Sequence, residues 1–318
     1  MKLWLEKIHL DLKVNWKLSR NQTTFKENFI VHFETDHGHF RSEIAPNIRY
    51  GETPESIETQ FAEWNKKNSF DLNTLDSKMF HSLRFGLESV LLAYGAAKKG
   101  KNLSSYLNLK DSRPQITSYS MPIMPIGEIA EYLKPLDRFK SLKIKVNAES
   151  AFDMLQEIHK RTQVKLRVDA NEGWSDLDEY LRFQEKIQGM NIELIEQPFP
   201  SHMHAEYREL KKISPYKLLA DESIEDVGDF SELSGQFHAV NIKLMKTGSL
   251  IKARELIHEA KRHNLEVMMG CMIETTIGIS YGMLFTGMVD YVDLDGFLLI
   301  KEEPFRLVKE TEGIVSLT

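Results

Sequence analysis

Cysteine is almost absent from this sequence: Cys271 is the only one among 318 residues. A single cysteine excludes an intramolecular disulfide and a zinc site built on several thiolates. It is typical of a protein that works in a reducing compartment. We therefore expect a cytoplasmic protein.

Long apolar runs and basic clusters are missing as well. No stretch approaches the roughly 18–20 apolar residues that a membrane-spanning helix needs, and charges interrupt the apolar residues near the start, unlike a signal peptide. The 41 Lys and Arg against 47 Asp and Glu leave a net charge of −6 without a basic patch. The hydrophobic fraction of 42% excludes intrinsic disorder. We expect an enzyme with a small-molecule substrate, and neither nucleic acid nor membrane as a partner.

Two halves of the chain differ in pattern. Residues 1–40 alternate apolar and polar positions, which predicts a small antiparallel sheet. Residues 54–67 and 80–100 have helical patterns, the first opening on a proline and the second ending on a glycine. The polar segment 109–115 contains a proline and favours a boundary near residue 112. We therefore predict an α+β domain over 1–112.

Eight short apolar or β-branched runs follow this boundary and alternate with helical patterns. They lie at 116–124, 142–146, 165–170, 192–197, 217–222, 239–245, 265–271 and 291–295. This alternation predicts a parallel (β/α) barrel. A doubly wound open sheet alternates in the same way, but no glycine-rich phosphate loop follows any strand, and the barrel is therefore favoured. We place the barrel at 113–297 and a C-terminal tail at 298–318.

Charged residues mark the ends of these runs. In chain order they are Lys143, Lys145, Asp169, Glu196, Asp221, Lys243, Glu274, Asp293 and Asp295. From Lys145 to Lys243 the successive spacings are 24, 27, 25 and 22 residues, one strand–helix unit each. The carboxyl ends of barrel strands open at one mouth, where barrel enzymes carry their active sites. We therefore expect these side chains to converge.

The converging groups suit one kind of chemistry. Asp169, Glu196 and Asp221 are hard oxygen donors that fit Mg²⁺ or Mn²⁺, and without a cation their like charges would suppress ionisation. Lys145 and Lys243 come from the strands on either side. A second lysine and a dication should lower the pKa of such a lysine enough to make it a base near neutrality. A cation between two bases is a layout for removing a proton next to a substrate carboxylate.

The same motifs resemble the enolase superfamily, in its muconate-cycloisomerase-like branch. The matching segments are SLKIKV (141–146), RVDANEGW (167–174), IEQP (195–198), LADES (219–223) and NIKLMKTGS (241–249). The resemblance implies a (β/α)7β-type TIM barrel, covered by an N-terminal α+β capping domain on which the C-terminal tail packs.

The resemblance also implies roles for the residues inside these motifs. The implied metal ligands are Asp169, Glu196 and Asp221, the opposed acid/base groups are Lys145 and Lys243, and Lys143 is a supporting cation. Asn171 and Glu222 lie close to these ligands in the sequence, and we expect them to orient the ligands through hydrogen bonds.

The last two predicted strands resemble those of dipeptide epimerases of the L-Ala-D/L-Glu epimerase type. They read MMGCMIETTIGIS (268–280) and YVDLDGFLLIKEEPF (291–305). The resemblance implies that Asp293 and Asp295 bind the substrate ammonium group, which suits the need of a buried amine for an anionic partner. Glu274 would shape the pocket. The implied reaction removes the α proton of the C-terminal residue, passes through a metal-stabilised enediolate, and returns a proton from the second lysine.

Side-chain specificity in this family is set by two loops of the capping domain. By resemblance they lie near 18–26 and 46–54. Arg20, Lys26 and Arg49 in these segments are candidates to receive an acidic substrate side chain.

Two alternatives stay open. Gly248 followed by Ser249, the segment FGLESVLL (85–92) and the short chain also resemble o-succinylbenzoate synthase, a dehydratase of menaquinone synthesis. A non-catalytic barrel is the second alternative, although such a descendant is expected to have lost a ligand or a lysine, and none is lost here. The oligomeric state also stays open, a homo-oligomer included.

Overall fold

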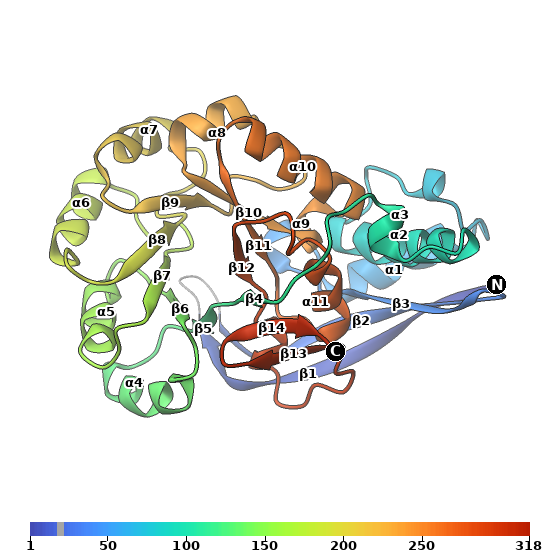
Figure 1. Ribbon diagram of the computed structural model, residues 1–318, viewed down its shortest axis with the longest axis horizontal. Helices are drawn as coiled ribbons and strands as arrows, with labels where there is room; N and C mark the ends of the chain where they lie inside the picture. The colour runs from blue at the N-terminus through green and yellow to red at the C-terminus, as the bar shows by residue number, and fades with distance from the viewer. Residues whose placement is uncertain (18–21) are drawn as a thin grey trace.

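The structure is a computed structural model that describes residues 1–17 and 22–318. Figure 1 shows a curved parallel sheet with helices on its outside, and beside it a long antiparallel sheet with its own helices. We call the antiparallel part, within residues 1–112, the cap, and the parallel part, within residues 113–297, the barrel. The predicted fold class is confirmed.

The cap sheet is antiparallel with strand order β1-β2-β3. Its strands are β1 (Lys2–Lys17), β2 (Gln22–Thr35) and β3 (Gly38–Ile44). Because side chains alternate across a strand, Phe29, Val31 and Phe33 share one face of β2, where all three are buried. The apolar alternation of the sequence therefore identifies this sheet correctly.

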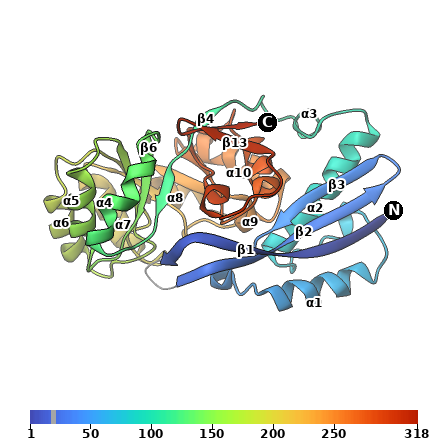
Figure 2. The same ribbon diagram turned by 90° about the horizontal axis from the view of Figure 1, so that it is seen from below.

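Helices pack on the apolar face of the cap sheet (Figure 2). They are α1 (Pro54–Asn65) and α2 (His81–Lys98). The short helix α3 (Leu103–Tyr106) contacts α2, and the cap also contains the 3₁₀ turns η1 (Ile48–Tyr50) and η2 (Leu72–Thr74). Thr53 and Ser56 exchange side chain–backbone hydrogen bonds of 3.2 and 2.9 Å, the capping box that starts α1. Gly86 brings α2 close to the sheet, since a Cβ there would lie 2.5 Å from Ile44 Cγ1.

The barrel has eight parallel strands in consecutive order. They are β5 (Tyr119–Met121), β6 (Ser141–Lys145), β7 (Lys165–Asp169), β8 (Ile192–Glu196), β9 (Lys217–Ala220), β10 (Ala239–Lys243), β11 (Glu266–Gly270) and β12 (Tyr291–Asp293). A single bridge between Thr117 and Val292 joins the first and last edges, so the barrel is nearly closed. Each of the eight predicted runs overlaps a strand, and every strand except β6 is shorter than its run; β6 has the same length and begins one residue earlier.

Helices cover the outside of the barrel (Figure 1). They are α4 (Ile126–Leu133) with the turn η3 (Lys134–Leu136), α5 (Ala151–His159), α6 (Leu177–Lys186), α7 (His204–Ile213), α8 (Phe230–Gln236) and α10 (Leu250–Arg262). Two further helices lie against the cap: α9 (Leu244–Thr247) contacts α2, and α11 (Thr276–Met283) contacts β3. Strands β6 and β10 are buried at every position, because one face meets the barrel interior and the other meets these helices.

The C-terminal segment contacts both parts of the molecule. It contains the turn η4 (Gly296–Leu299) and the strands β13 (Val308–Thr311) and β14 (Ile314–Leu317), which form a small sheet with β4 (Gln115–Ile116). Lys301 N donates to Asp11 O of the cap at 2.9 Å, and Arg138 of the barrel pairs with Glu310 at 3.0 Å. Across the described ranges no helix is both long and apolar enough to cross a bilayer.

Candidate active site

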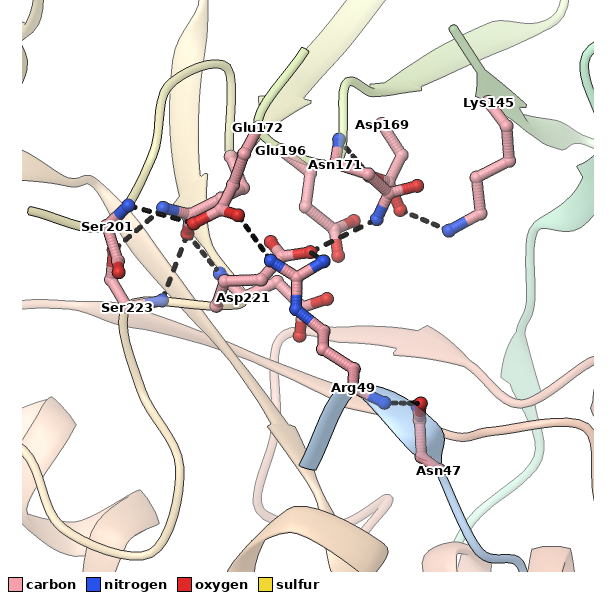
Figure 3. Close-up of polar contacts among 12 residues, drawn as sticks. Asn47, Arg49, Lys145, Asp169, Asn171, Glu172, Glu196, Ser201, Asp221 and Ser223 are labelled. Carbon is pink, nitrogen blue, oxygen red and sulfur yellow. Dashed lines mark hydrogen bonds and ion pairs between the residues drawn. The ribbon is translucent and has the colours of Figure 1, made fainter. Parts of the chain in front are cut away.

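The charged strand ends do converge at one mouth of the barrel. Strand β6 ends on Lys145, β7 on Asp169 and β8 on Glu196, and these three are paired in register along the sheet. Asp221 directly follows β9, and Lys243 ends β10. Parallel strands that end at the same level place their last side chains in one layer, and Figure 3 shows Lys145, Asp169, Glu196 and Asp221 gathered there.

Ion pairs connect the buried carboxylates of this layer to lysines. Lys145 Nζ lies 2.5 Å from Asp169 Oδ2, and Lys243 Nζ lies 2.7 Å from Asp221 Oδ2. Lys143 Nζ is central, at 3.0 Å from Asp169 Oδ2 and 2.8 Å from Glu196 Oε2. Asp169 and Glu196 have no exposed side-chain surface. The site is therefore a dense set of opposite charges withdrawn from water.

The electrostatics of this set follow from burial and partners. Burial alone would raise the pKa of Asp221, but the ammonium groups of Lys243 and Lys246 hold it well below its usual range. Burial and the charge of Asp169 raise the pKa of Glu196. Burial alone would lower the pKa of Lys243, but Asp221 outweighs it, and the pKa is raised. The predicted lowering of a lysine pKa assumes a bound dication that neutralises Asp221, so it stays a prediction.

The donor set fits a hard divalent cation by its chemistry. Asp169, Glu196 and Asp221 offer only carboxylate oxygens, and the buried Glu196 Oε2 takes part in no hydrogen bond although Lys143 lies 2.8 Å away. In the part of the chain that the structure describes, no three His, Cys, Asp or Glu side chains form a ready-made metal site. Lysine ammonium groups form ion pairs with the carboxylate oxygens of Asp169, Glu196 and Asp221 instead. A cation would have to displace these ammonium groups.

Several residues that orient these carboxylates are visible in the structure. Asn171, expected in this role, donates its backbone N–H to Asp169 Oδ1 at 3.0 Å. Sequence reasoning missed Asn241, whose Nδ2 donates to Glu196 Oε1 at 2.9 Å. It also missed Lys246, a buried ammonium that donates to Asp221 Oδ1 and Asp221 O, both at 2.6 Å. Both lie within the NIKLMKTGS motif, so the motif itself carried a signal for them.

The two acids at the end of β12 differ in their surroundings. Asp293 accepts hydrogen bonds from Lys143 Nζ at 2.8 Å and Ser118 Oγ at 2.6 Å. Burial alone would raise its pKa, but Lys143 lowers it to about 2. Asp295 accepts from Ser120 N at 2.6 Å, and burial together with the charge of Asp293 raises its pKa to about 7. Asp293 is thus tied into the ion-pair layer, whereas the Asp295 carboxylate lacks a full cationic partner among the described residues.

Glu274 lies where β11, α11 and the cap meet. Its Oε1 accepts the N–H of Met272 at 2.8 Å. A Cβ on Gly278 would lie 2.3 Å from Glu274 Oε2 and 3.1 Å from Glu43 Oε2, so both carboxyl groups border the same helical residue. Burial and the charge of Glu43 raise the pKa of Glu274 to about 8.

The cap residues expected to receive an acidic side chain are engaged elsewhere or not described. Lys26 Nζ donates to Pro46 O at 3.2 Å. Arg49 pairs with Glu172 and Glu222 of the barrel, and its expected role toward a substrate side chain stays a prediction. Arg20 lies outside the described residues. Glu222, expected to orient ligands, accepts from Asn171 Nδ2 at 3.3 Å, and burial and Asp221 raise its pKa to about 7.

Comparison with known proteins agrees with this geometry. The family model described as "Enolase C-terminal domain-like" matches residues 128–303. The L-Ala-D/L-amino acid epimerase of Flavobacterium johnsoniae is 30% identical, over 99% of this chain and 96% of its own length.

Solved structures show the same likeness. The substrate-liganded L-Ala-D/L-Glu epimerase from Bacillus subtilis has a TM-score of 0.90 at 25% identity, covering 100% of this chain and 96% of its own. The dipeptide epimerase from Methylococcus capsulatus, complexed with Mg and the dipeptide L-Arg-D-Lys, has a TM-score of 0.88 at 26% identity with the same coverage. The resemblance seen in the sequence motifs is confirmed: the chain belongs to the enolase superfamily, and its relatives include dipeptide epimerases.

Proposed function

We propose that this protein is a Mg²⁺-dependent dipeptide epimerase, an isomerase that inverts the α carbon of the C-terminal residue. One observation carries the proposal. Lys145 and Lys243 end β6 and β10, and the three strand ends between them bring Asp169, Glu196 and Asp221. This arrangement offers a proton donor and acceptor on both sides of a carboxylate-binding centre. The epimerases among the relatives support the same reaction class.

The three carboxylates would hold the cation, Mg²⁺ or Mn²⁺. Mg is the ion in the complex of the Methylococcus capsulatus relative, and the all-oxygen donor set of Asp169, Glu196 and Asp221 suits either ion. When bound, the cation would stabilise the negative charge that develops on the substrate carboxylate as the α proton leaves.

Lys145 and Lys243 would then move the proton. One neutral lysine removes the α proton from its face of the substrate, and the other, protonated, returns a proton from the opposite face. Lys243 serves as a base only once the charge of Asp221 is neutralised, because that charge raises its pKa. Both lysines are nearly buried, which keeps water from competing for the proton.

Asp295 and Asp293 would bind the substrate ammonium group. Among the described residues Asp295 forms no ion pair, while Asp293 is shared with Lys143. A buried ammonium needs such a charge-assisted partner. An uncharged amide or a muconate has no use for it, so the pair supports a dipeptide with a free amino terminus.

The proposal is tested by solvent exchange. A dipeptide library incubated with the wild-type enzyme and Mg²⁺ in D₂O should gain a single deuterium at the α carbon of the C-terminal residue, read by mass spectrometry. Lys145→Ala and Lys243→Ala should each lose epimerisation by roughly 10²-fold or more, because each removes an acid/base group. Lys160→Ala is the control, since Lys160 is exposed and contacts Gln156 and Glu157 of the neighbouring helix α5.

Two results would contradict the proposal in different ways. Unchanged dipeptide turnover after Asp293→Asn and Asp295→Asn would overturn the dipeptide assignment and leave the family membership intact. Loss of water from an o-succinylbenzoate precursor, without any dipeptide exchange, would favour the synthase instead.

A further inference from the structure

Arg49 connects the cap to the mouth of the barrel (Figure 3). Its Nη2 donates to Glu172 Oε2, and its Nη1 lies 3.3 Å from Glu222 Oε1. The side chains of Glu172 and Glu222 are only 7% and 6% exposed, whereas that of Arg49 is 33% exposed. One guanidinium thus neutralises two nearly buried carboxylates, a geometry that the planar fork of arginine suits and lysine does not.

The two glutamates stand on the loops that carry two proposed metal ligands. Glu172 follows Asp169 by three residues, and Glu222 directly follows Asp221. Other bonds tie these loops together. Glu172 Oε1 accepts from Ser201 N at 2.9 Å, its own N–H donates to Gln197 O at 2.8 Å, and Glu222 Oε1 accepts from Asn171 Nδ2 at 3.3 Å. A displacement of either glutamate would therefore also displace the loops after β7, β8 and β9.

On the cap side, Arg49 projects from a well-bonded turn. Asn47 Oδ1 accepts the N–H of Arg49 at 3.0 Å, and Gly51, at φ 73°, donates to Ile48 O at 3.0 Å. Glu52 joins the turn to α2: it accepts from Asn47 N at 3.2 Å and from Ser82 N at 3.0 Å. The guanidinium therefore moves with the cap and not independently of it.

Tyr50, the residue after Arg49, extends the contact between the cap and the barrel toward the proposed active site. Tyr50 follows Arg49 in η1 and is half-buried. The charges of Asp221 and Lys243 both act on it, and burial with the charge of Asp221 raises its pKa. Holding Arg49 in place therefore also holds Tyr50 where the charges of Asp221 and Lys243 act on it.

We propose that Arg49 is a latch, a positioning residue that couples docking of the cap turn 46–52 to the order of the loops carrying Asp169 and Asp221. The role of these loops rests on the proposed function, whereas the coupling itself is a property of the fold. Glu172 and Glu222 are the two barrel-side partners of the latch. Without the guanidinium, Glu172 and Glu222 would lose a cation that pairs with both of them, at side chains that are only 7% and 6% exposed.

Hydrogen exchange of the full chain, without substrate, tests the latch. In wild type the amides of Arg49, Tyr50, Gly51 and Glu52 are all hydrogen-bonded within the turn, and we expect them to be protected. Arg49→Met should raise exchange of peptide 46–52 at least 10-fold, and Arg49→Lys should give an intermediate rate, because one ammonium reaches only one glutamate. Arg138→Met, which breaks the barrel–tail pair with Glu310, is the matched control and should leave peptide 46–52 unchanged.

A triple variant, Arg49→Met/Glu172→Gln/Glu222→Gln, separates positioning from charge relief. It also removes the two carboxylate charges that face Arg49, so its melting temperature should return toward wild type, but exchange of peptide 46–52 should stay fast. In steady-state assays Arg49→Met should raise KM about 10-fold or more and lower kcat by a smaller factor, because the cap no longer closes the site. Wild-type protection of peptide 46–52 in Arg49→Met or in the triple variant would overturn the latch. Absence of dipeptide turnover in wild type would overturn the proposed function alone, since the exchange experiment needs no substrate.

Discussion

The pKa of a buried carboxyl group in this protein depends on whether a charged partner lies in contact with it. Glu274 and Asp293 are both fully buried carboxyl groups near strand ends, but only Asp293 has a lysine in contact. Their pKa values therefore move in opposite directions, to about 8 for Glu274 and about 2 for Asp293. A charged partner within hydrogen-bond distance thus decides whether burial produces a neutral acid or a fixed anion.

The raised pKa of Glu274 predicts a pH-dependent stability. The folded chain retains this proton up to about pH 8, whereas the ordinary value is 4.5. The contribution of Glu274 to the free energy of unfolding is therefore complete below pH 4.5 and is lost as the pH rises through 8. We expect Glu274→Gln, which keeps an acceptor for Met272 N, to be more stable than wild type at pH 9 and to lose less stability between pH 5 and 9.

Urea unfolding at pH 5 and pH 9 measures this difference. Glu259→Gln is the control, because Glu259 is on the outer face of α10 and pairs with exposed Arg262. Equal pH dependence of wild type and Glu274→Gln would show that the proton is not held there.

At the scale of elements, a carboxylate of the cap accepts hydrogen bonds at the start of helix α11. Glu43 of β3 accepts hydrogen bonds from Thr275 N and Gly278 N, both at 3.0 Å, and from Thr275 Oγ1 at 2.6 Å. Asn28 Nδ2 also donates to Glu43 Oε1 at 2.8 Å. The first amides of a helix lack partners within the helix, and a carboxylate satisfies them while facing the positive end of the helix dipole.

Removing this cross-domain cap should cost stability. Glu43→Ala leaves the amides of Thr275 and Gly278 without their acceptor in a buried seam, and we expect a loss of about 3 kcal/mol in the free energy of unfolding. Glu34→Ala, at an exposed position on the same sheet, should change it by less than about 0.5 kcal/mol. Chemical denaturation of both variants checks the prediction, and equal losses would show that the α11 start is capped from elsewhere.

At the scale of the whole molecule, the proposed cation would act as a cross-link between three strands. Anything that binds the folded chain alone stabilises it, by about 2.7 kcal/mol at a concentration 100-fold above Kd. We expect Mg²⁺ or Mn²⁺ to raise the melting temperature of wild type and to leave that of Asp221→Asn unchanged, because the variant lacks one carboxylate charge of the three. Asp226→Asn, whose side chain is partly exposed and pairs with Lys252, should respond like wild type.

Calorimetric scans with and without the cation, and with a chelator, give the measurement. A shift of equal size in Asp221→Asn and wild type would place the binding site away from the three carboxylates.

The architecture, and which residues meet at the candidate active site, could be predicted from the sequence alone. The period of apolar runs specified the barrel strands, because strands buried on both faces must be continuously apolar. The spacing of one strand–helix unit between Lys145, Asp169, Glu196, Asp221 and Lys243 was enough to predict that they meet, since parallel strands end in one layer. The apolar character of the strands and the regular spacing of the charged residues are enough for both predictions.

Only the tertiary structure decided the partners and charge states within that site. Arg49 and Glu172 are 123 residues apart, and Glu43 and Thr275 are 232 apart, so no local pattern pairs them. The difference between Asp293 and Asp295, two residues apart on one strand end, is equally invisible in the sequence. Partner choice and pKa depend on distance and desolvation, which exist only once the chain has folded.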